Sequence, residues 1–283
     1  MTPCVLTFDI EDWFQVENLR PLFPPERWDE VPRRVAIGTR VILDLLARHH
    51  VRGTFFVLGW VAEREPELVQ EIAAAGHEIA SHGYGHVLPM TLRPLSFRDD
   101  ILHGRKVLEE ITGRPVHGYR APAFSLDAER LAIVATCGYR YDSSHHPLRV
   151  HDRYGDLGPL GTPVRPGVYR VGGLTELALP VERLGPLSLP ASGGGYFRLY
   201  PGALFRFLAR RSISRWGHSI SYLHAWEFDP AQPRVRGAGV TRTFRHYNAL
   251  AKTLPRMERF LAMLKGAGAR FLTARDFVGE VGG

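Results

Sequence analysis

The sequence contains few cysteines and no long apolar run, and both absences narrow the classes of protein to consider. Two cysteines, Cys4 and Cys137, are too few for a disulfide framework, so we expect free thiols in a reducing compartment. No run of about eighteen apolar residues occurs, which argues against a transmembrane segment. The N-terminus has no basic region ahead of an apolar stretch and does not resemble a secretory signal. We therefore expect a cytoplasmic protein.

Lysine is also scarce, although the chain is basic. Only three of the 36 basic residues are lysines, namely Lys106, Lys252 and Lys265. The formal net charge is +7. The arginines are scattered, whereas nucleic-acid-binding proteins tend to cluster positive charge on one face or helix. We predict no nucleic-acid partner. A compositional bias towards arginine explains the charge, and an acidic glycan or a lipid-linked partner is the alternative.

Short apolar runs alternate with segments of helical period along most of the chain. The expected strands are residues 5–8, 53–58, 78–81, 118–120, 139–141, 221–223 and 269–272. The expected helices between the early strands are residues 34–49, 66–75, 96–111 and 127–137. This alternation predicts a parallel sheet covered by helices, and its seven or eight units favour an α/β barrel over an open sheet.

Residues 145–200 interrupt this alternation. They are rich in glycine and proline and show little helical period, so we interpret them as an irregular excursion over the barrel mouth with a small hairpin. A C-terminal helix and the last strand are expected within residues 240–283. The whole chain, residues 1–283, is thus predicted to form one domain.

Three carboxylates, Asp9, Glu11 and Asp12, lie within four positions directly after the first expected strand. In a parallel barrel this is the mouth at which catalytic groups gather. Crowded carboxylates repel one another unless a cation shares them or one of them is protonated. The segment therefore indicates a cation site or, as the alternative, a solvated acidic turn.

His82 and His86 follow the third expected strand, among glycines that let the backbone approach a ligand closely. Two imidazoles four residues apart can bind one metal ion if the segment turns like a helix or a tight loop. A carboxylate from the first segment as third ligand would leave a position open for water, as in catalytic zinc sites. Because the chain has 13 histidines, a chance pairing is the alternative.

Arg120 and His224 end two further expected strands. Arg120 precedes a rigid turn at Pro122, and a carboxylate at the mouth would be the natural partner of its guanidinium. His224 closes an apolar strand, where an imidazole can act as a general acid near neutral pH. Taken singly, a surface arginine and a core histidine are the alternatives. Together the four segments supply the parts that hydrolysis of an amide requires.

In order and spacing these segments resemble the polysaccharide deacetylases of the NodB-homology type, the carbohydrate esterase 4-like family. The family's Thr-Phe-Asp-Asp, His-x₃-His, Arg-x-Pro and Leu-His motifs are matched by Thr7–Asp12, His82–His86, Arg120–Pro122 and Leu223–His224. Tyr141–Ser144 resembles a further recurring segment of the family. The resemblance spans roughly residues 5 to 230.

Four segments resemble one branch of this family, the deacetylases found with exopolysaccharide and exosortase (PEP-CTERM) loci. They are Asp9–Phe14, Ser192–Arg198, Leu223–Pro230 and Arg245–Asn248. The resemblance implies a distorted (β/α)₇-type barrel and one divalent metal ion, zinc first, with cobalt, manganese or nickel as alternatives. It also implies removal of N-acetyl groups from a sugar in a polysaccharide or a lipid-linked glycan precursor, in association with the exopolysaccharide synthesis machinery.

The resemblance implies roles for individual residues as well. Asp9 would act as the general base, and Arg120 would keep it ionised and oriented. His224 would act as the general acid that protonates the departing amine. His82 and His86 would bind the metal.

The sequence offers two candidates for the third metal ligand. In the family an aspartate ligand directly follows the base, but here Ile10 intervenes, so that Glu11 or Asp12 takes that place. Glu11 shares a face with Asp9 if the strand continues, whereas the shorter Asp12 reaches the metal if the chain turns after Ile10. We favour Asp12.

Aromatic faces suit pyranose rings, although core packing is the alternative for each aromatic residue. The residues expected to contact the sugar are Tyr119, Pro122, Phe197 and Trp226, with Tyr196 and Trp13 as further aromatic candidates. Two other functions remain open. Related folds hydrolyse cyclic ureides or imides, and a non-catalytic barrel would bind a glycan without turnover.

Overall fold

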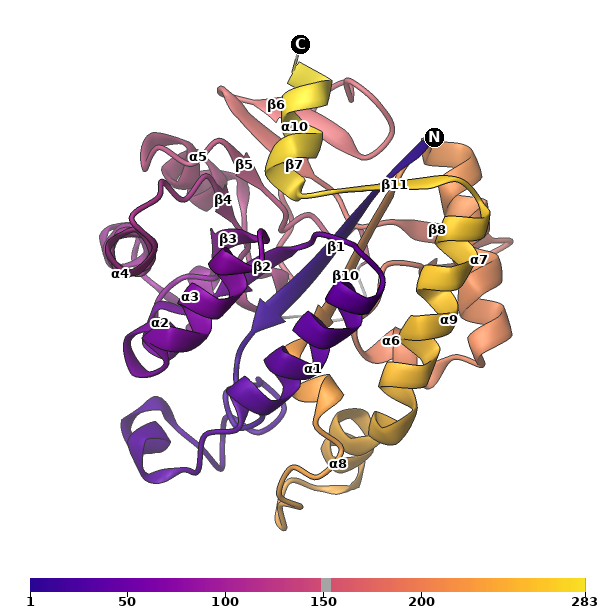
Figure 1. Ribbon diagram of the computed structural model, residues 1–283. Helices are drawn as coiled ribbons and strands as arrows, with labels where there is room; N and C mark the ends of the chain where they lie inside the picture. Colours follow the sequence, from indigo (N-terminus) through magenta and orange to yellow (C-terminus); the bar gives the residue numbers. More distant parts are fainter. Residues whose placement is uncertain (149–153, 283) are drawn as a thin grey trace.

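The computed structural model describes residues 1–148 and 154–282 of the chain. A single curled sheet forms its centre, and helices cover the outer face of that sheet (Figure 1). Neighbouring strands follow the order β10 (Ser219–His224), β1 (Thr2–Ile10), β2 (Thr54–Val57), β3 (Glu78–Ser81), β4 (Gly118–Tyr119), β5 (Tyr141–Asp142), β7 (Leu174–Leu177) and β6 (Val168–Val171), and β11 (Ala269–Leu272) also pairs with β1. All of these pairs are parallel except β6 with β7. The predicted α/β fold is confirmed.

Helices follow the strands much as the sequence predicts. They are α1 (Val35–Arg48), α2 (Gly59–Arg64), α3 (Pro66–Ala74), α4 (Pro94–Thr112), α5 (Ala128–Thr136), α6 (Gly194–Leu199), α7 (Gly202–Trp216), α8 (Val240–Tyr247), α9 (Thr253–Gly266) and α10 (Ala274–Gly282). A short 3₁₀ turn, η4 (Ala225–Phe228), directly follows β10. None of the described helices is long and apolar enough to cross a membrane.

Side chains alternate along β1, and this alternation positions the later site residues. The outer side chains join the large hydrophobic cluster, and they are Cys4, Leu6, Phe8 and Ile10. Val5 belongs instead to a second cluster with residues of β2, β5 and β10. Because the side-chain period of a strand is two, Thr7 and Asp9 share the inner face with Val5.

Regular strand pairing does not close the barrel in the described part of the chain. Residues 191–193 bridge the gap between β7 and β10: the Ala191 N–H donates to the Pro180 carbonyl oxygen (2.9 Å) and the Tyr222 N–H to that of Ser192 (2.9 Å). Gly193 has a φ of 143°, and a side chain there would overlap the Tyr222 carbonyl oxygen. The predicted distorted barrel is therefore a curled half-barrel. Residues 191–193 span the side on which regular strand pairing is missing.

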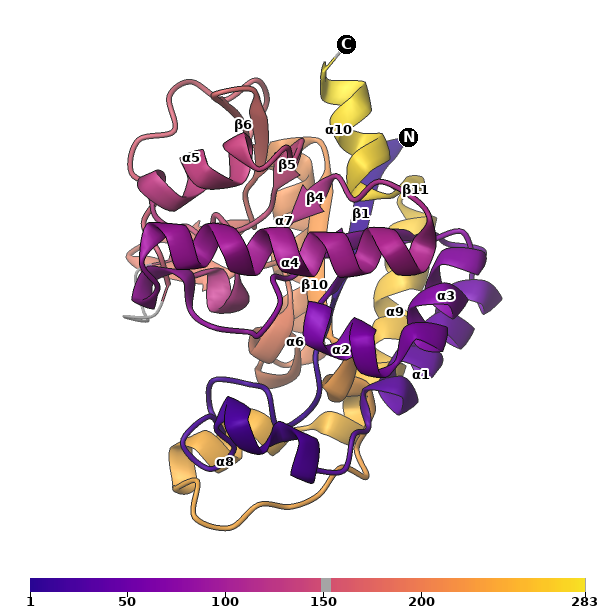
Figure 2. The ribbon, with the colours of Figure 1, turned by 90° about the vertical axis from the view of Figure 1, so that its left-hand side faces the viewer.

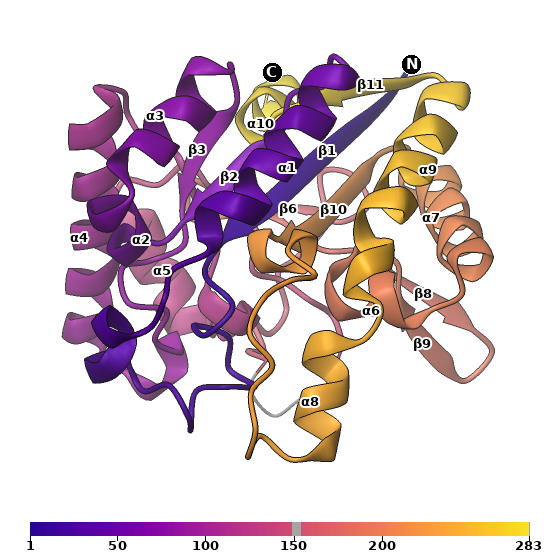
Figure 3. The same cartoon turned by 60° about the horizontal axis from the view of Figure 1, so that its bottom comes forward.

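The described residues of the region 145–200, which are 145–148 and 154–200, form two hairpins. One consists of β6 and β7 and extends the main sheet, because β7 pairs with the free edge of β5. The other consists of β8 (Val181–Leu184) and β9 (Leu187–Pro190), a separate two-stranded sheet that projects from the body (Figure 3). Helix α6 follows this second hairpin and leads back to the mouth of the half-barrel.

Close packing between α1 and η4 depends on Gly38, where a Cβ atom would lie 1.9 Å from the carbonyl oxygen of Ala225. We expect Gly38→Ala to lower the free energy of unfolding by roughly 1–3 kcal/mol, because the helix must move away from the turn. Urea denaturation measures this loss. Gly266→Ala is the control, since nothing lies within 4 Å of a Cβ atom at that position. Equal effects of the two changes would contradict the packing argument.

Candidate active site

Residues at the carboxyl ends of β1, β3 and β10 line a cavity of about 340 Å³. Its outer wall comes from residues 16–18 after β1, from α6 and from α8. Figure 2 shows α8 below the sheet. The cavity thus lies at the mouth where the sequence predicts the catalytic groups.

Glu11, His82 and His86 converge in this cavity and form what we call the candidate metal triad. Their ligand atoms all lie within 4.8 Å of one another, and all three side chains are buried. Glu11 Oε2 lies 2.6 Å from His86 Nε2, and both side chains are buried. A divalent cation would satisfy a buried carboxylate oxygen that faces two imidazoles in this way.

Local contacts fix the imidazoles and the loop between them. His82 Nδ1 lies 2.8 Å from the Arg120 carbonyl oxygen, and donation to that oxygen leaves Nε2 available for a metal. The Asp100 carboxylate accepts hydrogen bonds from the N–H groups of Tyr84 (3.0 Å) and Gly85 (3.2 Å). Burial lowers the pKa of His82 to about 4, so that its imidazole is neutral, as a metal ligand must be.

Asp12 does not belong to the candidate metal triad. Its carboxylate accepts hydrogen bonds from the N–H groups of Trp13 (2.8 Å), Arg34 (2.6 Å) and Val35 (2.9 Å), and it thereby caps the start of α1. The structure contradicts the preference for Asp12 over Glu11. The physical reason is that β1 continues through Ile10, which keeps Glu11 on the same face as Asp9.

Asp9 is held by a fully buried arginine. Arg120 Nη1 donates to Asp9 Oδ1 (2.7 Å) and to Thr7 Oγ1 (2.8 Å). On its other side, Arg120 donates to the Ser143 carbonyl oxygen (3.1 Å) and hydroxyl (3.0 Å). These contacts orient the Asp9 carboxylate so that Oδ2 lies nearer to His224, 3.9 Å from its Nε2.

His224 is held by Glu227, which lies three residues further along the chain. Glu227 Oε2 accepts hydrogen bonds from His224 Nδ1 (2.9 Å) and from the His224 backbone N–H (2.9 Å). Arg198 Nε donates to Glu227 Oε1 (2.6 Å), and both side chains of this ion pair are buried. His224 Nε2 consequently faces the cavity, where it lies 3.8 Å from Glu11 Oε1.

These contacts determine the protonation of the imidazole. Burial would lower the pKa of His224, but the hydrogen bond and the negative charge of Glu227 outweigh it and raise that pKa to about 9. Burial would likewise raise the pKa of Glu227, but the charge of Arg198 and the hydrogen bond to His224 bring it down to about 2. A protonated His224 beside an ionised Glu227 is suited to donate a proton near neutral pH.

Trp226 and Tyr196 line the cavity, as expected of sugar-contacting aromatic residues. Trp226 also donates from Nε1 to Glu11 Oε1 (3.0 Å) and so orients a member of the candidate metal triad. Tyr196 comes from α6, whose other aromatic residue, Phe197, faces the opposite way. Phe197 packs against Phe205 and Phe260 in the core, which corrects the expectation that it contacts the sugar.

Tyr119, Pro122 and Trp13 do not line the cavity either. Tyr119 is buried against Phe97 and Tyr139, because side chains alternate along β4 and its neighbour Arg120 takes the inner position. Pro122 is buried at the start of a 3₁₀ turn. Trp13 packs in the core among other aromatic rings. These expectations are corrected.

The sequence analysis missed two residues of the site, Glu227 and Arg198. For Glu227 a local signal existed, because it lies three residues after His224, the N-cap of η4, and a glutamate at that spacing is typical of a capping box. Arg198 has no such local signal. It reaches Glu227 only because α6 packs beside β10 and η4.

The family model of the polysaccharide deacetylases matches residues 27–141. This segment is similar to the polysaccharide deacetylases. Residues 143–277 match a second family, a domain of unknown function (DUF3473). Strands β10 and β11 of the second segment pair with β1, which pairs in turn with β2 of the first segment, so that both segments belong to one sheet. The second segment also contributes His224, Glu227 and Arg198 to the site.

Curated relatives of this chain include proteins named as deacetylases of glycans. The peptidoglycan-N-acetylglucosamine deacetylase of Bacillus cereus is 35% identical over 102 residues, which are 36% of this chain and 47% of that protein. The chitooligosaccharide deacetylase of a Bradyrhizobium species is 31% identical over 98 residues, 34% of this chain and 45% of that protein. The similarity thus covers less than half of each of these relatives.

Solved structures show the same fold over nearly the whole chain. A Mycobacterium smegmatis protein assigned to the polysaccharide deacetylases has a TM-score of 0.61 and 22% identity, covering 99% of this chain and 89% of that one. A carbohydrate esterase 4 pseudoenzyme from Bacillus anthracis has a TM-score of 0.56 and 14% identity, covering 98% of this chain and 65% of that one. Because one of these is a pseudoenzyme, the fold alone does not establish catalysis.

Proposed function

We propose that this protein is a metal-dependent hydrolase that removes N-acetyl groups from an N-acetylated sugar. One arrangement supports the proposal: the candidate metal triad, Asp9 and His224 line the same cavity, and each is held by buried partners. Hydrolysis of an amide requires activation of the carbonyl, a base for water and an acid for the amine. The match of residues 27–141 to the polysaccharide deacetylases supports the same reaction.

The candidate metal triad suits a divalent ion, zinc first, because two imidazoles and one carboxylate are the donors of many catalytic zinc sites. When bound, such an ion supplies Lewis-acid polarisation of the acetyl carbonyl and of the attacking water. The hydrogen bond from Trp226 keeps the Glu11 carboxylate in position for this task. Cobalt, manganese and nickel accept similar donors and remain alternatives.

Asp9 is the general base in this proposal. It takes a proton from the water that attacks the acetyl carbon, while Arg120 holds its Oδ1 and leaves Oδ2 for the transfer. The buried contacts of Arg120 with Ser143 keep the guanidinium in place, so the carboxylate does not have to reorganise during the reaction.

His224 is the general acid. It donates a proton from Nε2 to the sugar nitrogen as the C–N bond breaks, because an amine leaves poorly unless it is protonated. Glu227 accepts the hydrogen bond from Nδ1 and so directs the other ring nitrogen towards the cavity. The products are acetate and the free amino sugar.

We further propose that the glycan belongs to exopolysaccharide synthesis, as a polymer or a lipid-linked precursor met in the cytoplasm, and that the protein works with the synthesis machinery. The resemblance of residues 192–198, 223–230 and 245–248 to that branch of deacetylases supports this. These segments meet in space, because Arg198 contacts both Glu227 and the backbone of residues 245–248.

The test is release of acetate from N-acetylglucosamine oligosaccharides by the purified full chain. We expect acetate and free amine in equal amounts, loss of activity with a chelator and recovery with zinc or cobalt. Asp9→Asn is the control for contaminating activity, since it removes the base. Binding of the oligosaccharide without acetate release would favour the non-catalytic alternative, and hydrolysis of a cyclic ureide or imide instead would favour the other enzyme class.

A further inference from the structure

We propose that the α8 arm, residues 230–248, forms a subsite for a negatively charged sugar next to the cavity. The inference rests on the proposed function and narrows the substrate to an acidic, N-acetylated glycan. The arm comprises the loop after η4 and helix α8 itself. Figures 2 and 3 place α8 below the sheet, and residues of α8 line the cavity.

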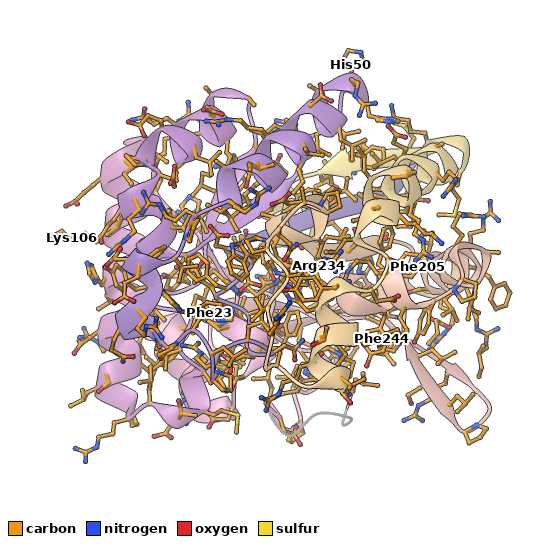
Figure 4. The ribbon with its side chains drawn as sticks, turned by 90° about the horizontal axis from the view of Figure 1, so that it is seen from below. Phe23, His50, Lys106, Phe205, Arg234 and Phe244 are labelled. Carbon is orange, nitrogen blue, oxygen red and sulfur yellow. The ribbon has the colours of Figure 1, made fainter. Side chains whose placement is uncertain are left out.

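One face of α8 is turned towards the cavity. The residues that line it are Thr241, Phe244, Arg245 and Asn248, whose spacing of three, four and seven residues forms a single helical stripe. Phe244 keeps 54% of its surface exposed, and Figure 4 shows it on the lower face of the molecule. Its ring is therefore available to pack on a sugar, between a guanidinium and an amide that can bind polar substituents.

The arm carries an excess of positive charge. Residues 230–248 contain no aspartate or glutamate, but they contain Arg234, Arg236, Arg242 and Arg245. Arg245 forms no ion pair within residues 1–148 and 154–282. A guanidinium at the edge of a cavity, without a protein carboxylate, is suited to bind the carboxylate of a ligand.

Arg198 connects the arm rigidly to the catalytic groups. Its guanidinium donates to the carbonyl oxygens of Arg245 (3.1 Å), His246 (3.0 Å) and Asn248 (2.6 Å), at the C-terminal end of α8. The same guanidinium forms the buried ion pair with Glu227, which holds the proton donor. A sugar bound by the stripe on α8 would therefore sit at a fixed position relative to the reacting amide, as a neighbouring subsite requires.

The ligand that fits this stripe is a uronic acid unit next to the N-acetylated unit. Its ring offers an apolar face to Phe244, and its carboxylate can accept two parallel hydrogen bonds from a guanidinium. Its hydroxyl groups match the side chains of Thr241 and Asn248. A neutral glycan would use the aromatic and amide groups but leave the charge of Arg245 without a partner.

The test compares two oligosaccharides of equal length by titration calorimetry, with the zinc-loaded full chain carrying Asp9→Asn, which should bind them without turnover. One is a chitin oligosaccharide, and the other is a hyaluronan oligosaccharide, in which N-acetylglucosamine alternates with glucuronic acid. We expect the acidic oligosaccharide to bind roughly tenfold to hundredfold more tightly, the effect of one charge-assisted contact. Arg245→Gln should remove this preference and retain binding of the neutral oligosaccharide.

Arg242→Gln is the matched control, because Arg242 lies on the same helix but does not line the cavity. It should retain the preference for the acidic oligosaccharide. Equal affinities for both oligosaccharides when the α8 arm is unchanged would overturn the subsite. An equal loss of the preference in Arg245→Gln and Arg242→Gln would overturn it as well. Failure to bind either oligosaccharide, together with no release of acetate by the chain that retains Asp9, would overturn the proposed function as well.

Discussion

Replacement of His224 by alanine is expected to lower kcat on an N-acetylated glycan by about 10²–10⁴-fold, the usual cost of losing a general acid. The physical reason is that the amine leaves poorly without a proton, and His224 Nε2 faces the cavity. The bound metal should remain, because His224 is not part of the candidate metal triad. Steady-state kinetics and metal content measured on the same sample check both statements. Turnover near the wild-type level would contradict the role of His224.

Replacement of Glu227 should change the pH dependence of the reaction. Its charge and its hydrogen bond raise the pKa of His224 and so oppose burial, which lowers that pKa. In Glu227→Gln the charge is gone, so burial lowers the pKa of His224 and less of the acid is protonated at a given pH. The alkaline limb of the kcat profile should therefore move to lower pH. A bound metal ion lowers the pKa of His224 in both proteins, so the comparison is between two metal-loaded samples.

Glu182 offers a matched control for this change. It is also a buried glutamate with arginine partners, Arg211 (3.0 Å) and Arg215 (3.1 Å), but it does not line the cavity. Glu182→Gln should lower the stability of the fold and leave the pH profile unchanged. If both variants moved the profile alike, the shift would reflect general loss of structure and not the orientation of His224.

Replacement of Glu11 by alanine is expected to abolish binding of one divalent ion per chain, whereas Asp12→Ala should retain that ion. Glu11 belongs to the candidate metal triad, while the oxygens of Asp12 accept backbone hydrogen bonds at the start of α1. Loss of such a cap typically costs about 0.5–2 kcal/mol in the free energy of unfolding. Metal analysis after zinc loading, combined with urea denaturation, separates the two effects.

Asp12→Asn serves as a second variant in case Asp12→Ala does not fold, because the asparagine side chain keeps an oxygen that can accept the hydrogen bonds at the start of α1. It should bind zinc like the wild-type protein and lose less stability than Asp12→Ala. Retention of zinc in Glu11→Ala together with its loss in Asp12→Asn would show that Asp12 is the third metal ligand, as favoured from the sequence. His82→Ala provides the reference for complete loss of the metal.

Much of the fold and part of the site could be predicted from local patterns. Apolar strands alternating with helical segments indicate a parallel sheet, because these periods express which face each element buries. The parallel direction then brings the residues after several strands to one edge, which is why the sequence alone groups Asp9, His82, Arg120 and His224. His82 and Arg120 indeed meet there, through the hydrogen bond from the imidazole to the Arg120 carbonyl oxygen.

Strand alternation explains where that reasoning failed. Tyr119 and Arg120 are neighbours in the same motif, yet one packs in the core and the other reaches Asp9. Glu11 follows Asp9 at the distance of one strand repeat, whereas Asp12 faces the start of α1. Each outcome depended on how far a strand continues and which face it buries, and residue types alone do not determine either.

The sequence by itself determined the sheet of parallel strands, the order of the motifs and the types of acid, base and ligand at its mouth. Only the tertiary structure decided which of these groups act on one another. Arg198 holds Glu227 across 29 positions of the chain, and Arg120 holds Asp9 across 111. Contacts of this kind are made when distant elements pack, and local periodicity contains no information about the partner that packing will bring. For the same reason, the position of α8 beside the cavity emerged only from the folded chain.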